Sequence, residues 1–411
     1  MRGITARLAW VVALAPLIVG APRVAGAQDA PRNVAEALKA EAADALPLTP
    51  FYDTPANLAA TKPGALLREE RSDGYALPKG VRAVRILYHS LDATGHAVAT
   101  SAVVLIPAGA TPPGGWPVIA WAHGTSGVAR QCAPSLMKDV YYGEEGLFPM
   151  VRAGYAVVAT DYRGLGSEGP HQYVNKLAQG YDVIFSIPAA RAAAPQLGAR
   201  WVVDGHSQGG LAAWSVAELE HSRHDAGYLG AVAVAPGADL GDMLNAGPLA
   251  AGNGFYIDYV AWGARARTPS FRPSQMLSGD LLARYHDVTT KGCFEYGYAS
   301  FLGDTGPAAL KPGWEAATGV RRLFRETEVA QSPIDGPLLV IAGGGDHTVP
   351  IAAVRAEVGE ACRRGIALQF RSYPGLDHDP TMVKSTPDQL AWIADRFAGK
   401  PASDSCPAAP G

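Results

Sequence analysis

The sequence predicts an α/β fold with a mostly parallel central sheet that is covered by helices on both faces. Short apolar runs recur along the chain and alternate with longer stretches of helical periodicity, a pattern typical of strands buried between helices. The 411 residues are 48% hydrophobic and only 18% charged, which excludes a disordered chain. Its 47 glycines and 32 prolines indicate many turns between short elements.

The first predicted elements form a hairpin. After a polar segment that contains prolines, residues 83–89 and 97–106 are expected to be strands, joined by a turn at residues 92–95. Their spacing favours an antiparallel pair. The continuous apolar runs at residues 116–122 and 155–160 predict two further strands, buried on both faces.

Helices and strands then alternate to the end of the chain. The predicted helices are residues 178–194, with a kink at Pro188, residues 211–222 and residues 387–397. The predicted strands are residues 201–203, 231–235, 337–342 and 368–373. This alternation is what predicts parallel rather than antiparallel pairing.

About 100 residues separate the strand that ends at residue 235 from the strand that begins at residue 337, whereas a strand-to-helix connection needs only a few. We expect an inserted helical cap, or lid, over residues 240–315, with the core divided into residues 28–239 and 316–411. The alternative is an ordinary extra helical layer with no functional role.

The N-terminus has the layout of a secretory signal peptide over residues 1–27. Arg2 and Arg7 precede an apolar run at residues 8–20, and the sequence AGA at residues 25–27 offers a cleavage site. The run has about 13 residues, fewer than the roughly 20 that span a bilayer. We therefore expect a secreted or periplasmic protein without a transmembrane segment. A buried N-terminal helix or a membrane anchor is the alternative.

The cysteines and the net charge exclude several classes of partner. In an oxidising compartment, four cysteines predict two disulfide bonds, with three possible pairings: Cys132, Cys293, Cys362 and Cys406. No C-x-x-C pair is present, so we expect no zinc site, and no motif indicates a cofactor. The formal charge of −3 without a basic tract argues against nucleic acid.

A nucleophile motif lies at residues 204–210, with the sequence DGHSQGG. It contains G-x-S-x-G between a predicted strand and a predicted helix, which is the context of a nucleophile elbow. We expect Ser207 to be the nucleophile and the backbone N–H of Gln208 to bind the oxyanion. The structural alternative is a glycine-rich turn.

A serine nucleophile needs a base, and the base needs an acid that orients it. In this kind of fold the chain order is serine, acid, histidine. Asp346 follows a late predicted strand, whereas Asp335 precedes it and would lie at the wrong edge of the sheet. His378 is the only histidine after the last predicted strand, and His347 precedes that strand. We therefore expect Asp346 to be the acid and His378 the base.

The loop at residues 123–127, with the sequence HGTSG, follows an earlier buried strand. We expect its Thr125 N–H to be the second oxyanion donor, with Ser126 as the alternative. Each such donor contributes about 3 kcal/mol of transition-state stabilisation. The loop lacks a G-x-G-x-x-G or G-K-[ST] pattern, so it is not interpreted as a phosphate cradle.

These features resemble the α/β-hydrolase superfamily. Three segments narrow the resemblance to the secretory lipase family, of the lipase A type known from yeasts with bacterial relatives: CAPS at residues 132–135, DYRGLG at 161–166 and APGADL at 235–240. The resemblance covers nearly all of the chain after the signal peptide. Yeast members have glycine where Gln208 stands.

The resemblance implies Ser207 as nucleophile, Asp346 as acid and His378 as base. It also implies two disulfide pairings, Cys132–Cys293 and Cys362–Cys406.

Three functions are expected from this combination. A lipase would act on lipid esters at a lipid–water interface, with an apolar tunnel lined by cap residues: Leu249, Phe255, Tyr256, Tyr259 and Trp262. A soluble carboxylesterase or acyltransferase would use the same three residues under a tighter cap. A non-catalytic binding protein that keeps the fold is the third alternative.

Overall fold

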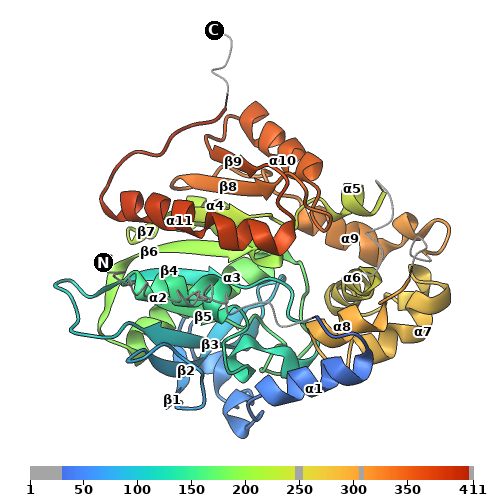
Figure 1. The fold of residues 1–411 in the computed structure, drawn as a ribbon, viewed down its shortest axis with the longest axis horizontal. Helices are drawn as coiled ribbons and strands as arrows, with labels where there is room; N and C mark the ends of the chain where they lie inside the picture. The colour runs from blue at the N-terminus through green and yellow to red at the C-terminus, as the bar shows by residue number, and fades with distance from the viewer. Residues whose placement is uncertain (1–29, 246–252, 305–309, 407–411) are drawn as a thin grey trace, which may run out of the picture.

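A computed structural model describes residues 30–245, 253–304 and 310–406 (Figure 1). The predicted signal peptide lies outside the described residues, so its prediction stands untested. Within the described chain, one nine-stranded sheet has the order β1-β2-β3-β5-β4-β6-β7-β8-β9. Its strands are β1 (Leu66–Arg71), β2 (Arg82–Leu91), β3 (Ala97–Ile106), β4 (Trp116–Ala122), β5 (Ala156–Thr160), β6 (Leu197–His206), β7 (Tyr228–Val234), β8 (Leu338–Gly343) and β9 (Gln369–Tyr373).

The sheet is antiparallel at one end and parallel over the rest, which confirms the predicted fold class. β2 and β3 form the expected antiparallel hairpin, in register from Arg82 opposite Ile106 to Leu91 opposite Ala97. From β5 through β4, β6, β7 and β8 to β9, every pairing is parallel. Every residue of β5 is buried, because the sheet is covered on both faces.

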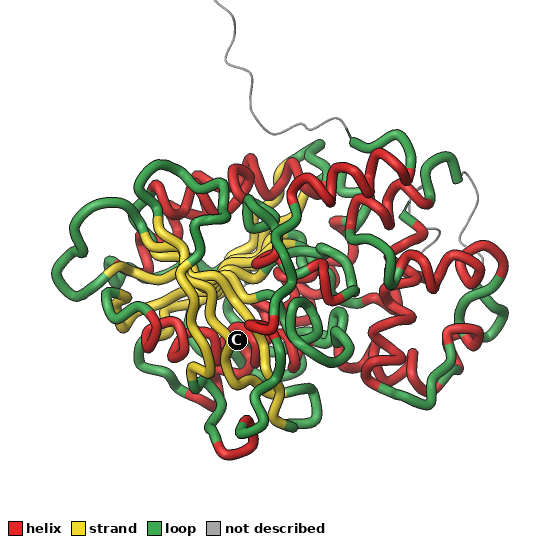
Figure 2. Tube along the Cα trace, turned by 90° about the horizontal axis from the view of Figure 1, so that it is seen from below, coloured by secondary structure: helices red, strands yellow, loops and turns green. Residues whose placement is uncertain are grey.

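Helices cover the two faces of the sheet (Figure 2). Apolar side chains of α3 and α4 pack on one face, and those of α2 and α11 pack on the other. The helices are α1 (Val34–Asp44), α2 (Phe148–Arg152), α3 (Lys176–Ala193), α4 (Gln208–Arg223), α5 (Leu240–Asn245), α6 (Gly254–Arg267), α7 (Gly279–Val288), α8 (Phe294–Ser300), α9 (Thr318–Thr327), α10 (Ile351–Arg363) and α11 (His378–Phe397).

The predicted beginnings of two helices and the extent of one strand were wrong. The last helix begins at His378 rather than at residue 387, because the Asp377 side chain caps it by accepting from the His378 N–H, and Pro387 lies inside the helix. Helix α4 begins at Gln208, three residues before the predicted start. β6 extends well beyond the three residues predicted for it.

Two elements of the entry segment were not predicted. β1 extends the sheet with the half-exposed sequence LLREER, which lacks an apolar alternation. α1 is rich in alanine and has Ala37 as its buried residue, and its Glu41 carboxylate accepts from the N–H groups of Cys293 and Tyr296, 3.0 and 2.8 Å away. A carboxylate there satisfies free donors at the N-terminus of α8. The entry segment therefore holds a distant helix in place.

Helices α5 to α9 lie between β7 and β8 and gather beside one end of the sheet (Figure 1). We call residues 240–327 the helical insertion. The predicted cap ended at residue 315, and α9 continues the helical run beyond that point to Thr327. Whether the insertion acts as a lid remains a prediction. No helix in residues 30–245, 253–304 and 310–406 is long and apolar enough to cross a membrane.

Both disulfide pairings that the resemblance implied are present. Cys132 is joined to Cys293, with a Cα–Cα distance of 5.3 Å, and Cys362 is joined to Cys406 at the same distance. The first bond connects the loop after β4 to the start of α8. The second fastens the C-terminal tail to α10. The 161-residue separation of the first pair makes it the longer-range crosslink.

Candidate active site

Ser207 occupies a strained turn between β6 and α4. Its φ of 59° and ψ of −118° lie in a region that residues other than glycine rarely adopt. The turn is held by hydrogen bonds from the Ser207 N–H to the Val234 carbonyl, 2.9 Å, and from the Gly237 N–H to the Ser207 carbonyl, 3.0 Å. This is the geometry that the G-x-S-x-G motif predicts.

The two glycines of the motif are required by close backbone approach. A Cβ atom on Gly205 would lie 2.2 Å from the Gly209 carbonyl oxygen, and one on Gly209 would lie 1.8 Å from the Ala122 carbonyl oxygen. Real Cβ contacts are not found at such distances. The start of α4 is therefore pressed against the end of β4, next to the HGTSG loop.

Asp346 and His378 meet at the same edge of the sheet. The Asp346 Oδ2 atom lies 2.8 Å from the His378 Nδ1 atom, and Asp346 Oδ1 accepts from the N–H groups of Thr348 and Val349. The two loops touch directly, since the Gly345 N–H donates to the Leu376 carbonyl at 3.0 Å. Because β6, β8 and β9 are parallel, the residues that follow them reach one edge.

The elbow lies against this pair. The ring centroid of His206, the residue before Ser207, lies 4.5 Å from that of His378. Ser207, Asp346 and His378 are 7%, 7% and 6% exposed, so all three are covered from bulk solvent. The Nδ1 atom of His378 is taken by Asp346, and its buried Nε2 atom has no hydrogen-bond partner among the described residues. That nitrogen is the one available to accept a proton.

Electrostatics distinguish His378 from the other buried histidines. Burial lowers the pKa of His123 to about 4 and that of His171 to about 3, so both rings are neutral. Burial and the nearby His378 lower the pKa of His206 well below its usual range. Burial also acts to lower the pKa of His378, but the hydrogen bond and charge of Asp346, together with Asp379, outweigh it and raise that pKa.

The HGTSG loop is fixed by its side chains and by the helical insertion. The Thr125 Oγ1 atom lies 2.7 Å from the Tyr173 hydroxyl, and the Tyr141 hydroxyl donates to the Thr125 carbonyl. The Ser126 hydroxyl donates to the Cys132 carbonyl at 2.8 Å, and the Ser126 carbonyl accepts from the Phe294 N–H. These contacts orient the peptide groups of the loop beside the elbow.

The buried carboxylate of Asp161 joins the CAPS segment to the DYRGLG segment. Asp161 accepts from the Ser101 hydroxyl at 2.6 Å and from the Ser135 N–H and hydroxyl at 2.7 and 2.5 Å. Burial raises the pKa of Asp161 to about 6, although these donors favour its charged form. The contact joins the loop after β5 to the loop that carries Cys132.

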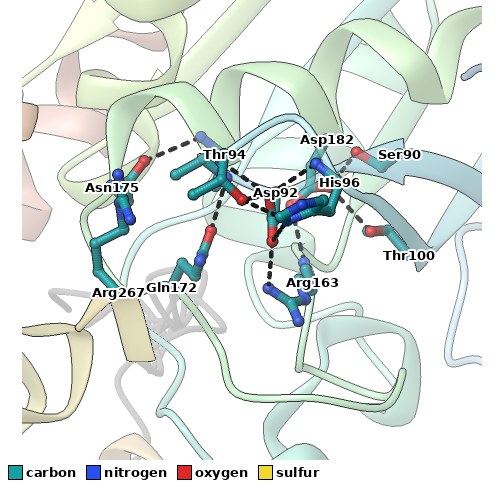
Figure 3. Close-up of polar contacts among 12 residues, drawn as sticks. Ser90, Asp92, Thr94, His96, Thr100, Arg163, Gln172, Asn175, Asp182 and Arg267 are labelled. Carbon is teal, nitrogen blue, oxygen red and sulfur yellow. Dashed lines mark hydrogen bonds and ion pairs between the residues drawn. The ribbon is translucent and has the colours of Figure 1, made fainter. Parts of the chain in front are cut away.

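Asp182 of α3 binds the DYRGLG loop through Arg163 (Figure 3). Its carboxylate accepts from the hydroxyls of Ser90 and Thr100, 2.5 and 2.9 Å away, and from the Arg163 N–H at 2.8 Å. Arg163 also lies 3.7 Å from Asp92 in the β2–β3 turn. Neither Asp161 nor Asp182 was singled out from the sequence, because a buried carboxylate with hydroxyl donors looks like an ordinary polar residue in sequence.

The predicted cap residues do not share one environment. Phe255 and Tyr259 are fully buried, with their ring centroids 5.6 Å apart, whereas Tyr256 and Trp262 are partly exposed. Tyr259 also lies 5.8 Å, centroid to centroid, from Tyr173, which contacts Thr125. Leu249 lies outside the described residues. The insertion is thus linked to the HGTSG loop by aromatic contacts as well as by the disulfide bond.

Comparison with known proteins identifies the family of this chain. A model of the secretory lipase family matches residues 140–405, which include Ser207, Asp346 and His378. The chain belongs to the secretory lipase family. Among curated proteins of similar length is a probable inactive lipase of Mycobacterium tuberculosis, 26% identical over 382 residues, which cover 86% of this chain and 83% of that one.

Solved structures share the fold of this family member. Candida antarctica lipase A superposes with a TM-score of 0.74 at 18% identity, covering 88% of this chain and 89% of that one. The rice cell wall degrading esterase LipA of Xanthomonas oryzae superposes with a TM-score of 0.67 at 19% identity, covering 82% and 99%. Both support the α/β-hydrolase fold.

Proposed function

We propose that this chain is an exported serine ester hydrolase that cleaves carboxylic esters, most of all the acyl esters of lipids, in the manner of a triacylglycerol lipase. The observation that carries the proposal is the buried Asp346–His378 hydrogen bond beside Ser207, whose backbone is strained. Strained backbone at a strand-to-helix turn is a common feature of catalytic nucleophiles. Membership of the secretory lipase family supports both export and the ester substrate.

In the proposed mechanism, the Ser207 hydroxyl attacks the ester carbonyl carbon while the Nε2 atom of His378 takes its proton. The tetrahedral intermediate then collapses, the ester C–O bond breaks, and His378 gives the proton to the leaving alcohol. Water, activated by His378, attacks the acyl-enzyme and releases the acid. Asp346 keeps the imidazole in the tautomer with its proton on Nδ1 throughout both halves.

The developing oxyanion needs fixed donors, and two backbone N–H groups are proposed. Gln208 begins α4, so its N–H belongs to the positive end of a helix. Thr125 lies in the adjacent loop, held through its side chain and carbonyl, with Ser126 as the alternative donor. The Gln208 side chain lies 3.0 Å from the His171 ring and so stays away from the oxyanion position.

The decisive experiment is replacement of Ser207 by alanine in the purified mature chain. Hydrolysis of p-nitrophenyl esters and labelling by a fluorophosphonate should both be abolished. The melting temperature should not fall, since alanine keeps the backbone hydrogen bonds of position 207 with Val234 and Gly237. Ser222→Ala, on the exposed end of α4, is the matched control and should behave as wild type. Activity that persists in Ser207→Ala would refute the assignment.

Acyl-chain length separates the two catalytic alternatives. Rates are compared between emulsified long-chain triacylglycerol and dissolved short-chain esters. A rate increase at the solubility limit of the substrate supports the lipase, in which Tyr256 and Trp262 would contribute apolar surface. A maximum with dissolved short-chain esters supports a soluble carboxylesterase or acyltransferase that uses the same three residues.

A non-catalytic binding protein is the second candidate, and one observation favours it: a relative that covers most of this chain is named a probable inactive lipase. Fluorophosphonate labelling decides this point independently of substrate choice. Stoichiometric labelling at Ser207 favours the enzyme, whereas a folded wild-type chain that is not labelled favours the binding protein.

A further inference from the structure

A second set of ligand-type side chains overlaps the proposed active site. His206, His378 and Asp379 each contribute one nitrogen or oxygen atom to a group whose members all lie within 4.8 Å of one another. His206 is fully buried and His378 is 6% exposed, while Asp379 lies at the surface. The residues come from the end of β6 and the first turn of α11.

The two imidazoles have unused coordinating capacity. Neither ring nitrogen of His206 meets the geometry of a hydrogen bond with a described residue, although the His378 backbone lies near enough to act on this ring, and Nε2 of His378 has no partner either. Buried polar atoms without partners cost free energy, so this arrangement is expensive unless a ligand occupies it. The ester hydrolysis proposed above uses one of these three nitrogens and leaves both of those on His206 unexplained.

The surroundings of His378 match those of a metal-binding histidine. Histidines that ligate metals almost always donate their other ring N–H to a carboxylate or carbonyl group. Nδ1 of His378 makes this contact with Asp346 at 2.8 Å, which fixes the tautomer that leaves Nε2 free to coordinate. A carboxylate–histidine pair that serves a proton-transfer step is thus also suited to bind a metal ion.

We propose that His206, His378 and Asp379 form a binding site for Zn²⁺ whose occupation reversibly switches off the ester hydrolase. Two neutral imidazoles and one carboxylate, with a fourth position for water, are a typical ligand set for zinc. The sequence did not indicate this site, because it has no cysteine pair of the kind that binds zinc. Two of the ligands, His206 and His378, lie 172 residues apart in the chain.

The required rearrangement is small and falls on the exposed ligand. Zinc–ligand bonds of about 2 Å in a tetrahedron separate the ligand atoms by roughly 3.3 Å. The group therefore closes by about 1.5 Å at most from its 4.8 Å limit. Asp379 is exposed, whereas the two imidazoles are buried with their ring centroids 4.5 Å apart.

Neighbouring charges favour a cation at this position. The negative charge of Asp379 contributes to raising the pKa of Glu145 and of Glu295, so two further acidic groups lie within electrostatic range of this ligand. Zinc on Nε2 of His378 would occupy the lone pair that accepts the Ser207 proton. Inhibition follows directly, and removal of the metal restores the base.

Equilibrium dialysis of the purified chain against ZnCl₂, with bound metal counted per chain, tests binding without any substrate. We expect one zinc ion per wild-type chain, and at least tenfold weaker binding in both His206→Phe and Asp379→Asn. Phenylalanine keeps a ring beside Tyr142, and Asp379→Asn covers the case in which the buried variant does not fold. Glu145→Gln is the matched control, which removes a neighbouring charge but no ligand and should weaken binding less than threefold.

Zinc should also inhibit hydrolysis of p-nitrophenyl esters over the concentration range in which it binds, and EDTA should reverse the inhibition. Magnesium, which prefers oxygen ligands, should do neither. Absence of stoichiometric zinc, or zinc binding that both ligand variants leave unchanged, would overturn the proposal. Because dialysis needs no turnover, a chain without esterase activity still gives a clear answer about the metal.

Discussion

Asp258 of α6 offers a sharp test of how burial controls ionisation in the helical insertion. Its side chain is fully buried, and neither carboxylate oxygen has a hydrogen-bond partner among the described residues. Arg284, the cation that acts on this carboxyl, is hydrogen-bonded to the Ser300 carbonyl and to Asp304. Burial raises the pKa of Asp258 to about 8, while Arg284 only partly opposes the shift.

The sign of the pH dependence follows from that shift. Between an unfolded pKa of about 3.9 and the folded pKa, the native chain keeps a proton that the unfolded chain has lost, so stability falls as pH rises. At about 1.4 kcal/mol per pH unit, the loss from pH 5 to pH 8 amounts to about 4 kcal/mol. Asp258→Asn removes this dependence, since an amide does not titrate.

Urea unfolding followed by tryptophan fluorescence at pH 5 and pH 8 measures the effect. The free energy of unfolding of Asp258→Asn, minus that of wild type, should be about 4 kcal/mol higher at pH 8 than at pH 5, because only the wild type loses stability. Asp287→Asn is the control: this residue of α7 is partly exposed and paired with Lys291, and its loss should change stability by less than about 1 kcal/mol at both pH values. A relative stability of Asp258→Asn that is equal at pH 5 and pH 8 would show that Asp258 is not buried as described.

Three further predictions follow from the site and its supports. Asp346→Asn should lower kcat for p-nitrophenyl esters by about 10⁴-fold, because the wrong imidazole tautomer is favoured; a change below tenfold would contradict the role of Asp346. Gly209→Ala should lower the free energy of unfolding by about 3 kcal/mol or more, since its Cβ would lie 1.8 Å from the Ala122 carbonyl oxygen, whereas Gly359→Ala in α10 should raise it by about 1 kcal/mol. If the urea midpoints of both variants shifted from the wild-type value in the same direction, this reasoning would be contradicted. Replacing Cys132 and Cys293 together by serine should cost about 5 kcal/mol on the chain-entropy model, against about 4 kcal/mol for Cys362 with Cys406, because the first loop spans 161 residues and the second 44; the reverse order in calorimetry would refute it.

The strands of the parallel core were predictable because burial on both faces leaves an unmistakable apolar run. β3 and β4 have the bounds that their sequences suggest. β1 and α1 could not be predicted in this way, since elements that bury few of their residues carry little apolar periodicity. α1 is held instead by distant partners, as the contact of Glu41 with Cys293 illustrates.

The residues of the candidate site also divide into those that the sequence predicts and those that it does not. Ser207, Asp346 and His378 were predictable because each follows a strand whose position in a parallel sheet fixes the edge it reaches. Asp161 and Asp182 were not, because their importance depends on donors contributed from other loops and strands, such as Ser135 and Ser90. The start of α11 was missed because a proline inside a helix was taken for its first turn.

The disulfide bond between Cys132 and Cys293 limits how the helical insertion is able to move. It holds the two Cα atoms 5.3 Å apart, and Glu41 of α1 binds the same N-terminus of α8. Any opening over the sheet must therefore be a rotation about this anchored corner, with the largest excursions at the helices farthest from it. Reduction of the Cys132–Cys293 bond would remove the covalent part of this anchor, so that the helical insertion would move more freely relative to the sheet.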